Sequence, residues 1–209
     1  MHISDGVLSG PVLVTGFVAA IGIAAYTLRR VDLEDIPKIS VVTAAFFVAS
    51  LIHIKLPGIS IHLILNGLVG IILGIQAFPA ILLGLVLQAI LFGHGGVTVI
   101  GVNAVMLGGG ALIAHFAWQQ RHKFNLKNND VTFAAIGGAI GILSSGCVLA
   151  LALMTTSEAF AVISAAAIGV HVVLMLIEGA VAAACIGFIL KVKPSLLNTP
   201  SQSAKVTSE

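Results

Sequence analysis

Long stretches without a charged side chain alternate with short polar stretches along this sequence. A helix needs about 20 apolar residues to cross the roughly 30 Å hydrocarbon core of a membrane. The longest stretch, Ile59–Phe92, exceeds one crossing, and Pro79 inside it suits the first turn of a new helix, so two short helices are expected there. The pattern predicts an all-α polytopic membrane helix bundle of about seven transmembrane helices, in Val7–Leu28, Ile39–Ile54, Ile59–Phe92, Val97–Trp118, Val131–Met154 and Ala159–Leu190.

Composition and charge agree with this interpretation. Hydrophobic residues make up 58% of the 209 residues and charged residues 9%, whereas soluble domains carry about 25% charged residues. Cytoplasmic loops of membrane proteins are enriched in Lys and Arg. If the amino terminus lies outside, every Lys and Arg except Lys55 falls on the cytoplasmic side. We therefore expect the amino terminus outside.

The two ends of the chain lead to separate expectations. Arg29 and Arg30 follow the first apolar stretch instead of preceding it, which argues against a secretory signal peptide, and we expect the mature chain to begin at Met1. The tail is rich in Ser, Thr and Pro, which is typical of disorder. The sequence thus predicts a single transmembrane domain over residues 1–193 and a disordered cytoplasmic tail over residues 194–209.

Four of the seven histidines fall near the predicted outer face: His2, His53, His62 and His94. Each one alone is accounted for as an ordinary histidine at the membrane interface. Together they favour a metal site, because imidazole is the commonest side-chain ligand for metals and other ionisable groups are scarce on this face. Another histidine, His171, lies within the seventh predicted helix.

The first two residues offer a chelate of their own. The α-amino group of Met1, the amide nitrogen of His2 and the Nδ1 atom of His2 close a five-membered and a six-membered ring on one ion. Three nitrogens in a plane leave a fourth position for another imidazole, and such a site suits Ni²⁺ or Cu²⁺. The fourth ligand is either His62, in the first turn of the third predicted helix with Asn66 on the same face, or His94, in a glycine-rich loop.

Three stretches carry a family resemblance: Met1-His2-Ile3 with Asp5-Gly6, Pro57-Gly58 through His62 to Gly67, and Gln88 through His94-Gly95-Gly96 to Asn103. They resemble the membrane substrate-binding subunits of nickel and cobalt energy-coupling-factor transporters, the CbiM/NikM family, and the likeness extends to about Lys193. It implies that the amino-terminal segment inserts into the bundle and that the metal is bound by Met1, His2 and His62. The resemblance also makes four residues candidates for a supporting or entry role: Asp5, Asn66, His94 and Asn103.

The resemblance implies a substrate-binding (S) component of an ATP-driven importer for Ni²⁺ or Co²⁺ in a bacterial or archaeal cell membrane. Cobalt uptake would serve cobalamin biosynthesis, but the stretch Ile61–Gly67 lacks the Ser-His-Pro-Thr-Gly string associated with the cobalt type, which favours nickel. The sequence has no Gly-x-x-x-x-Gly-Lys-Ser/Thr motif, so we expect ATP hydrolysis on other chains and no enzymatic activity here. The implied partners are a transmembrane coupling (T) subunit, two ATP-binding cassette ATPase subunits and a small accessory membrane subunit; no cofactor or nucleic acid is expected.

Two other classes of function remain as alternatives. An intramembrane metalloenzyme needs a catalytic constellation, and the sequence offers one His/acid pair within a predicted helix, His171 and Glu178. A self-contained channel or secondary transporter is expected to show repeated halves and paired intramembrane charges, and neither is convincing here.

Two further features have open roles. Glu178 is an ionisable residue within a predicted transmembrane helix, where such residues usually have a function. It is expected to order the bundle, relay protons or contact the coupling subunit, and its place toward the cytoplasmic half argues against metal ligation. The small-residue stripe Gly16, Ala20 and Ala24 lets helices approach closely, either in a partner subunit or within the bundle.

Overall fold

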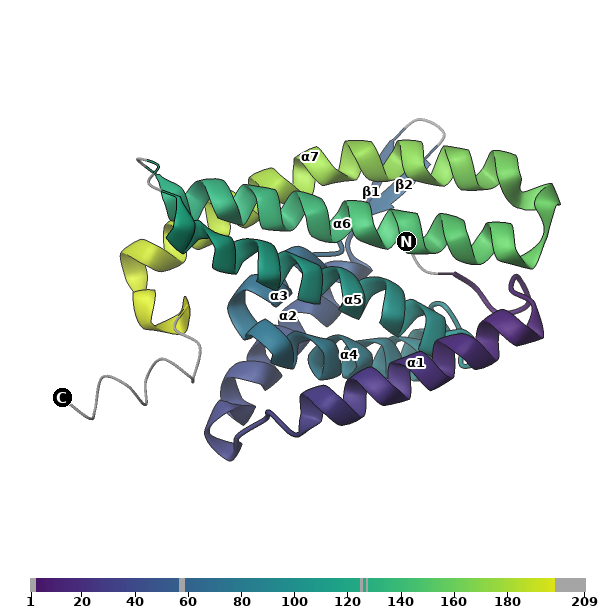
Figure 1. Cartoon of the computed structure of the whole chain (residues 1–209), viewed down its shortest axis with the longest axis horizontal. Coiled ribbons are helices and arrows are strands. Elements are labelled where there is room, and N and C mark those ends of the chain that lie inside the picture. The colour runs from purple at the N-terminus through teal and green to yellow at the C-terminus, as the bar shows by residue number, and fades with distance from the viewer. Residues whose placement is uncertain (1–2, 57–58, 125, 127, 198–209) are drawn as a thin grey trace.

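The computed structural model describes residues 3–56, 59–124, 126 and 128–197, and for residues 53–62 we describe the backbone alone. This part of the chain folds into a bundle of α-helices with one two-stranded hairpin beside it (Figure 1). Short 3₁₀ turns join several of the helices. The elements are α1 Gly10–Leu28, α2 Ile36–Leu51, β1 His53–Leu56, β2 Ile59–His62, α3 Asn66–Leu73, α4 Ala77–Phe92, α5 Ile100–Gln119, α6 Asn129–Thr156 and α7 Ala161–Val192.

The described part of the chain contains seven α-helices, whereas the sequence predicted about seven that cross the membrane. Five helical segments are long and apolar enough to cross a membrane, one of them made of α3, the turn after it and α4. Helix α2, with 16 residues, is shorter than one crossing requires. The chain is therefore a polytopic helical membrane protein. Its five candidate spans are Gly10–Leu28, Asn66–Phe92, Ile100–Lys123, Asn129–Thr156 and Glu158–Val192.

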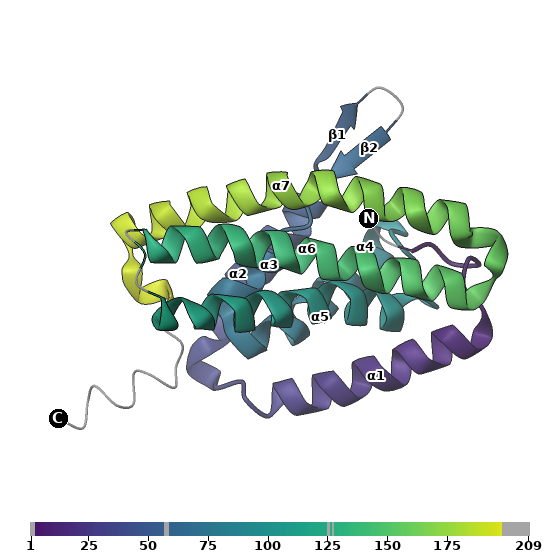
Figure 2. The same ribbon diagram turned by 45° about the horizontal axis from the view of Figure 1, so that its top comes forward.

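The hairpin between α2 and α3 was not predicted, and the expected positions of two histidines in helices are wrong. β1 and β2 pair antiparallel with His53 opposite His62, and the hairpin projects from the bundle past α7 (Figure 2). Apolar and polar residues alternate on both sides of the dipeptide Pro57-Gly58, and this period of two around a turn dipeptide is typical of a hairpin. His62 therefore precedes α3 and does not share a helix face with Asn66.

The predicted break inside the long apolar stretch is confirmed. α3 ends at Leu73, and Gly74 follows with φ 63° and ψ −133°, a conformation that glycine adopts readily. A 3₁₀ turn, Gly74–Gln76, leads into α4. Gln76 Nε2 donates hydrogen bonds to the carbonyl of Arg30 at 3.1 Å and to Oδ2 of Asp35 at 2.6 Å. The turn is thereby tied to the connection between α1 and α2.

Helix α5 lies at the centre of the bundle, in contact with α1, α3, α4 and α6. At two glycines the short helix α3 packs closely on the backbones of α5 and α6. A Cβ atom on Gly70 would overlap the carbonyl of Ala111 in α5, and one on Gly67 would lie 2.6 Å from Gly138 Cα in α6. Glycine is therefore required at both positions of α3 to bring three backbones together.

The small-residue stripe of α1 also faces α5. Gly16, Ala20 and Ala24 are buried, and a side chain at Gly16 would collide with Val102 of α5. Much of the remaining surface of α1 is apolar and exposed, including Val18 and neighbouring residues. The stripe therefore packs within the bundle, which decides between its two expected roles.

Folded structure extends beyond residue 193, where the sequence placed the end of the domain. Pro194–Leu197 forms a 3₁₀ turn, and Leu197 is buried with Trp118, Phe133 and Ile186. The folded part therefore reaches at least residue 197. The remaining tail, 198–209, lies outside the described residues, so its disorder stays a prediction.

The packing of α3 on α5 can be tested with Gly70→Ala and the matched control Gly109→Ala. A methyl group on Gly70 meets the backbone of α5, whereas one on Gly109 has no heavy atom within 4 Å. We expect Gly70→Ala to destabilise the protein by about 1–3 kcal/mol and Gly109→Ala to be neutral or stabilising by up to about 1 kcal/mol, because alanine favours helix. Thermal unfolding in detergent measures both, and equal unfolding temperatures for the two variants would contradict this packing.

Candidate functional site

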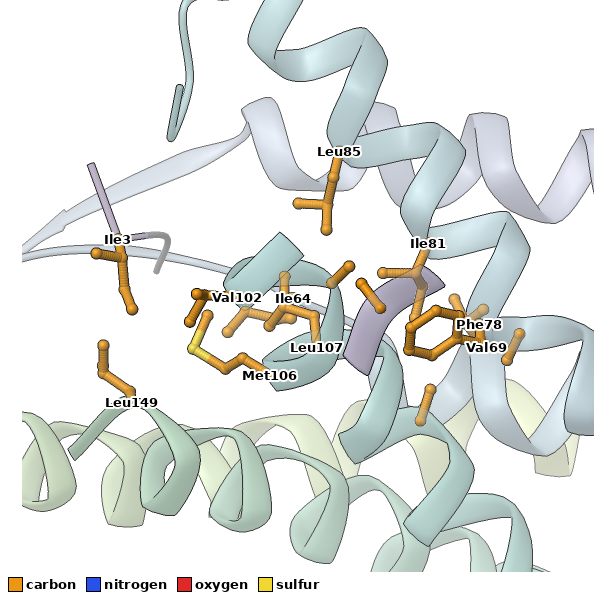
Figure 3. Close-up of a cluster of buried hydrophobic side chains, with 14 of the residues drawn as sticks. Ile3, Ile64, Val69, Phe78, Ile81, Leu85, Val102, Met106, Leu107 and Leu149 are labelled. Atoms are coloured by element: carbon orange, nitrogen blue, oxygen red, sulfur yellow. The ribbon is translucent and has the colours of Figure 1, made fainter. Parts of the chain in front are cut away.

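The first described residue lies inside the protein. Ile3 is 4% exposed, and its side chain and that of Leu149 in α6 point toward each other (Figure 3). The Ile3 amide donates to Asn103 Oδ1 at 3.0 Å, and Asn103 Nδ2 donates to the Ile3 carbonyl at 3.0 Å. One side chain of α5 thus satisfies both backbone groups of a residue that has no strand or helix neighbour, as a buried segment requires. The amino-terminal segment is inserted in the bundle from Ile3 onward.

A second contact holds this segment against the loop between α4 and α5, residues 93–99. The Asp5 amide donates to the Gly95 carbonyl at 2.9 Å, and Asp5 Oδ1 accepts from the Thr98 amide at 3.1 Å and from Thr98 Oγ1 at 2.5 Å. Gly96 has φ 122°, and a Cβ atom there would overlap the Asp5 carboxyl group. The glycine-rich loop therefore closes around Asp5. His94, which is half-buried, belongs to the same loop.

The irregular segment that follows β2 is held by α7. The amides of Ile64 and Leu65 both donate to the carboxylate of Glu178, with Leu65 N 2.9 Å from Oε2. Leu65 has a positive φ of 55° and immediately precedes α3. Glu178 is 2% exposed, and its carboxyl oxygens accept hydrogen bonds at the amino-terminal end of α3, where backbone amides lack partners within the helix. Of its three expected roles, the structure shows the ordering of the bundle.

The same arrangement changes where Glu178 lies relative to the site. The sequence placed Glu178 toward the cytoplasmic half, away from the outer histidines. In the structure its carboxylate contacts the backbone two and three residues after His62. The expected place of Glu178 came from its position along α7. That position does not show that the chain after β2 approaches the middle of α7.

Asn66, the first residue of α3, is hydrogen-bonded to two other helices. Its Nδ2 atom lies 3.1 Å from the Leu107 carbonyl in α5, and 3.3 Å from the Gly141 carbonyl and 2.9 Å from Ser145 Oγ in α6. Its Oδ1 atom accepts from the Gly67 amide at 2.8 Å. Because Asn66 is fully buried and all its polar atoms have protein partners, it supports the start of α3.

The structure brings together some of the residues that the sequence singled out. Asp5 and Asn103 contact the amino-terminal segment, and His94 lies in the loop that contacts Asp5. Met1 and His2 lie outside the described residues, and the side chain of His62 is not described. Where side chains are described, no group of three or more His, Cys, Asp or Glu residues is placed to share one metal ion. The proposed ligands therefore remain predictions.

The contacts made by Asn103 and Glu178 were not predicted from the sequence. Asn103 was singled out through the family resemblance, but its pairing with Ile3 joins residues 100 positions apart. The contact of Glu178 with Ile64 joins residues 114 positions apart. The signal available for Glu178 was its charge within an apolar helix, which marks a role but does not name the partner.

These features define a polytopic membrane protein whose amino-terminal segment is folded into a helical bundle. Residues 2–196 match the family described as the cobalt uptake substrate-specific transmembrane region, CbiM. The chain belongs to this family of transmembrane components for cobalt and nickel uptake.

Individual proteins similar to this chain are also named as metal transport proteins. The chain is 41% identical to a putative metal transport protein of Haemophilus influenzae, over 74% of this chain and 75% of that protein. It is 26% identical to a putative fused nickel transport protein NikMN of Archaeoglobus fulgidus, over 99% of this chain and 71% of that protein. It shares its fold with the crystal structure of a truncated transition metal transporter, with a TM-score of 0.76 at 24% identity, covering 91% of this chain and 99% of that chain.

The anchoring of the amino-terminal segment can be tested with Asn103→Leu, which removes both hydrogen bonds to Ile3 and keeps the number and branching of the side-chain heavy atoms. Two hydrogen bonds of about 1 kcal/mol each predict amide exchange in residues 3–8 that is roughly tenfold faster or more. Hydrogen–deuterium exchange measured by mass spectrometry checks this, with α6 peptides as the internal control. Unchanged exchange in residues 3–8 would show that Asn103 does not hold the segment.

Proposed function

We propose that this protein is the substrate-binding component of an ATP-driven energy-coupling-factor importer and that the imported ion is Ni²⁺ or Co²⁺. The observation that carries the proposal is the pairing of Ile3 with Asn103. It fixes the chain in the interior of the bundle, two residues after the amino group of Met1. Membership of a cobalt and nickel uptake family supplies the transport context.

Chain connectivity limits where the first two residues reach. Two residues span at most about 7 Å, so the amine of Met1 and the nitrogens of His2 stay close to Ile3. Near Ile3 the walls are apolar, with Val102 from α5 and Leu149 from α6 in the same core cluster (Figure 3). We propose that the Met1 amine, the His2 amide nitrogen and His2 Nδ1 bind the ion there as a planar chelate.

We propose His62 as the fourth ligand. Its strand leads directly into the backbone that Glu178 holds, so α7 fixes the position of the chain just after His62. His94 is proposed to act in entry, because its loop is joined to the amino-terminal segment through Asp5. In this scheme Asp5 and Asn103 support the chelate.

The proposed donors are all nitrogens, which suit Ni²⁺ in a planar arrangement and also bind Co²⁺. The family description names cobalt, and the relative from A. fulgidus is named for nickel. Because the Ser-His-Pro-Thr-Gly string associated with the cobalt type is missing, we propose nickel as the ion and cobalt as the alternative.

The proposed importer also needs partners. Two ATP-binding cassette subunits hydrolyse ATP, a transmembrane coupling subunit transmits the motion, and a small accessory membrane subunit completes the complex. We propose a multi-pass orientation in the cell membrane with the amino terminus outside.

Partners within the chain weigh against a catalytic role for the one His/acid pair of α7. The Glu178 carboxylate accepts from the amides of Ile64 and Leu65, and His171 Nδ1 lies 2.8 Å from the Ala167 carbonyl. A general acid or base with its partner requires the two side chains within hydrogen-bonding reach of each other or of a shared substrate. No observation favours a metalloenzyme over a transport subunit.

The chelate predicts that neither the spacing nor the free amine can change. Inserting one glycine between Met1 and His2, or fusing a tag before Met1, should abolish cellular accumulation of nickel and cobalt, because the ligands must be held within about 0.5 Å of their positions. A carboxyl-terminal tag should have no effect and serves as the control. Metal content of cells with matched amounts of membrane-inserted protein measures this, and full accumulation with an intact amino-terminal tag would refute the chelate.

The choice of the fourth ligand makes a separate prediction. His62→Ala should remove most Ni²⁺ binding by the purified protein, whereas His94→Ala should leave a weakened but measurable site. Isothermal titration with Ni²⁺ distinguishes them. A silent His62→Ala together with loss of binding in His94→Ala would show that the wrong histidine was chosen.

A further inference from the structure

A groove lies between α1 and α5 on the surface of the bundle, near the end at which both helices finish (Figure 1). Its volume is about 430 Å³, which is within the roughly 300–1,000 Å³ of typical ligand sites. The Thr27 hydroxyl in its wall donates to carbonyls of its own helix. The other residues that line the groove are mostly apolar: Gly22, Ile23 and Tyr26 of α1, Ile75 of the 3₁₀ turn before α4, and Leu112 and Phe116 of α5.

The groove is open and has room beside α1. Tyr26 is 56% exposed and Phe116 is 52% exposed, so both aromatic rings reach the outer surface of the bundle. A Cβ atom on Gly22 would meet no heavy atom within 4 Å. In a protein surrounded by lipid, an open apolar groove of this kind can accept a hydrocarbon chain.

Positive charge lies at the end of this groove. Arg29 and Arg30 directly follow the first candidate span, and both are exposed. The guanidinium carbon of Arg30 is 5.4 Å from the centroid of the Tyr26 ring, so the cation lies over one wall of the groove. Three acidic residues follow within the next five positions. In the part of the chain that the structure describes, however, the one ion pair joins Arg121 to Asp130, so neither Arg29 nor Arg30 is paired with a carboxylate.

The hydrogen-bond donors at this end are held in place. Arg30 Nη2 donates to Tyr26 Oη at 3.3 Å, so the phenol oxygen accepts and its own hydrogen remains for another acceptor. Gln76 Nε2 donates to the Arg30 carbonyl at 3.1 Å, and Gln76 adjoins Ile75 in the groove wall. Arg30 is thereby fixed relative to the groove. A guanidinium group beside a phenol O–H suits the oxygens of a phosphate group.

We propose that this groove binds an anionic phospholipid, with one acyl chain along the apolar walls beside Gly22 and the phosphate group at Arg30 and Tyr26. Basic pockets between transmembrane helices bind acidic lipid headgroups, and tyrosine is enriched at the depth of the headgroups. This lipid site is separate from the proposed metal site and uses none of its ligands. In the proposed orientation it faces the cytoplasmic leaflet, where anionic lipids are enriched.

The test uses the full-length protein in detergent and two phospholipids with the same acyl chains, dioleoylphosphatidylglycerol and dioleoylphosphatidylcholine. Native mass spectrometry measures how tightly the first molecule of each lipid is bound. We expect phosphatidylglycerol to bind roughly fivefold more tightly or more, because phosphatidylcholine has no net charge to attract Arg30. Equal affinity for the two lipids would overturn the proposal.

Two variants with matched controls locate the site. Arg30→Gln should abolish the preference for phosphatidylglycerol. Gly22→Leu places a side chain in the groove and should weaken binding of the first lipid roughly tenfold or more, the equivalent of about two displaced methylene groups. The controls are Lys191→Gln, which removes a positive charge from the last turn of α7, and Gly169→Leu, on an exposed part of α7 where a Cβ atom also meets no heavy atom within 4 Å. Neither control should change lipid binding.

Thermal unfolding is measured for each variant, and where one groove variant does not fold the other decides. If Arg30→Gln and Gly22→Leu bind phosphatidylglycerol as the unmodified protein does, the lipid binds elsewhere and the proposal is wrong. If they bind the lipid normally but release a partner subunit from the assembled transporter, the groove accommodates a helix of that subunit instead, which also contradicts the proposal.

Discussion

Backbone groups that leave regular secondary structure inside a membrane protein must find partners within the protein, because the hydrocarbon core offers no water. Two side chains meet this constraint here. Asn103 pairs with both backbone groups of Ile3, and Glu178 accepts from the amides of Ile64 and Leu65. Without them, neither the amino-terminal segment nor the chain after β2 has a favourable place inside the bundle. Both irregular segments that the proposed site requires therefore depend on two polar residues of α5 and α7.

The glycine contacts make this arrangement possible in so small a bundle. Gly67 and Gly70 bring α3 against the backbones of α6 and α5, and Asn66 ties the first residue of α3 to both helices. Helix α3 is only eight residues long, and the irregular chain just before it is held by Glu178.

Much of the helical fold could be predicted from uncharged stretches and one proline, since crossing a membrane requires a long apolar helix. The hairpin was not predicted, because the length of an uncharged stretch does not reveal the period-two alternation around Pro57-Gly58. The proposed metal ligands come from their chemistry and from the family resemblance, and they stay predictions. The supporting contacts of Asn103 and Glu178 could not be predicted, because they join positions about a hundred residues apart and follow from the three-dimensional packing.

The central claim is that the ion binds beside the inserted amino-terminal segment. The most direct test is a crystal structure of the full-length protein with Ni²⁺, with the metal located by its anomalous scattering. Two residues reach about 7 Å and a metal–nitrogen bond adds about 2 Å, so a single peak is predicted within about 10 Å of the Ile3 Cα atom. A metal peak located elsewhere in the bundle, or none in a crystal grown with excess Ni²⁺, would contradict the claim.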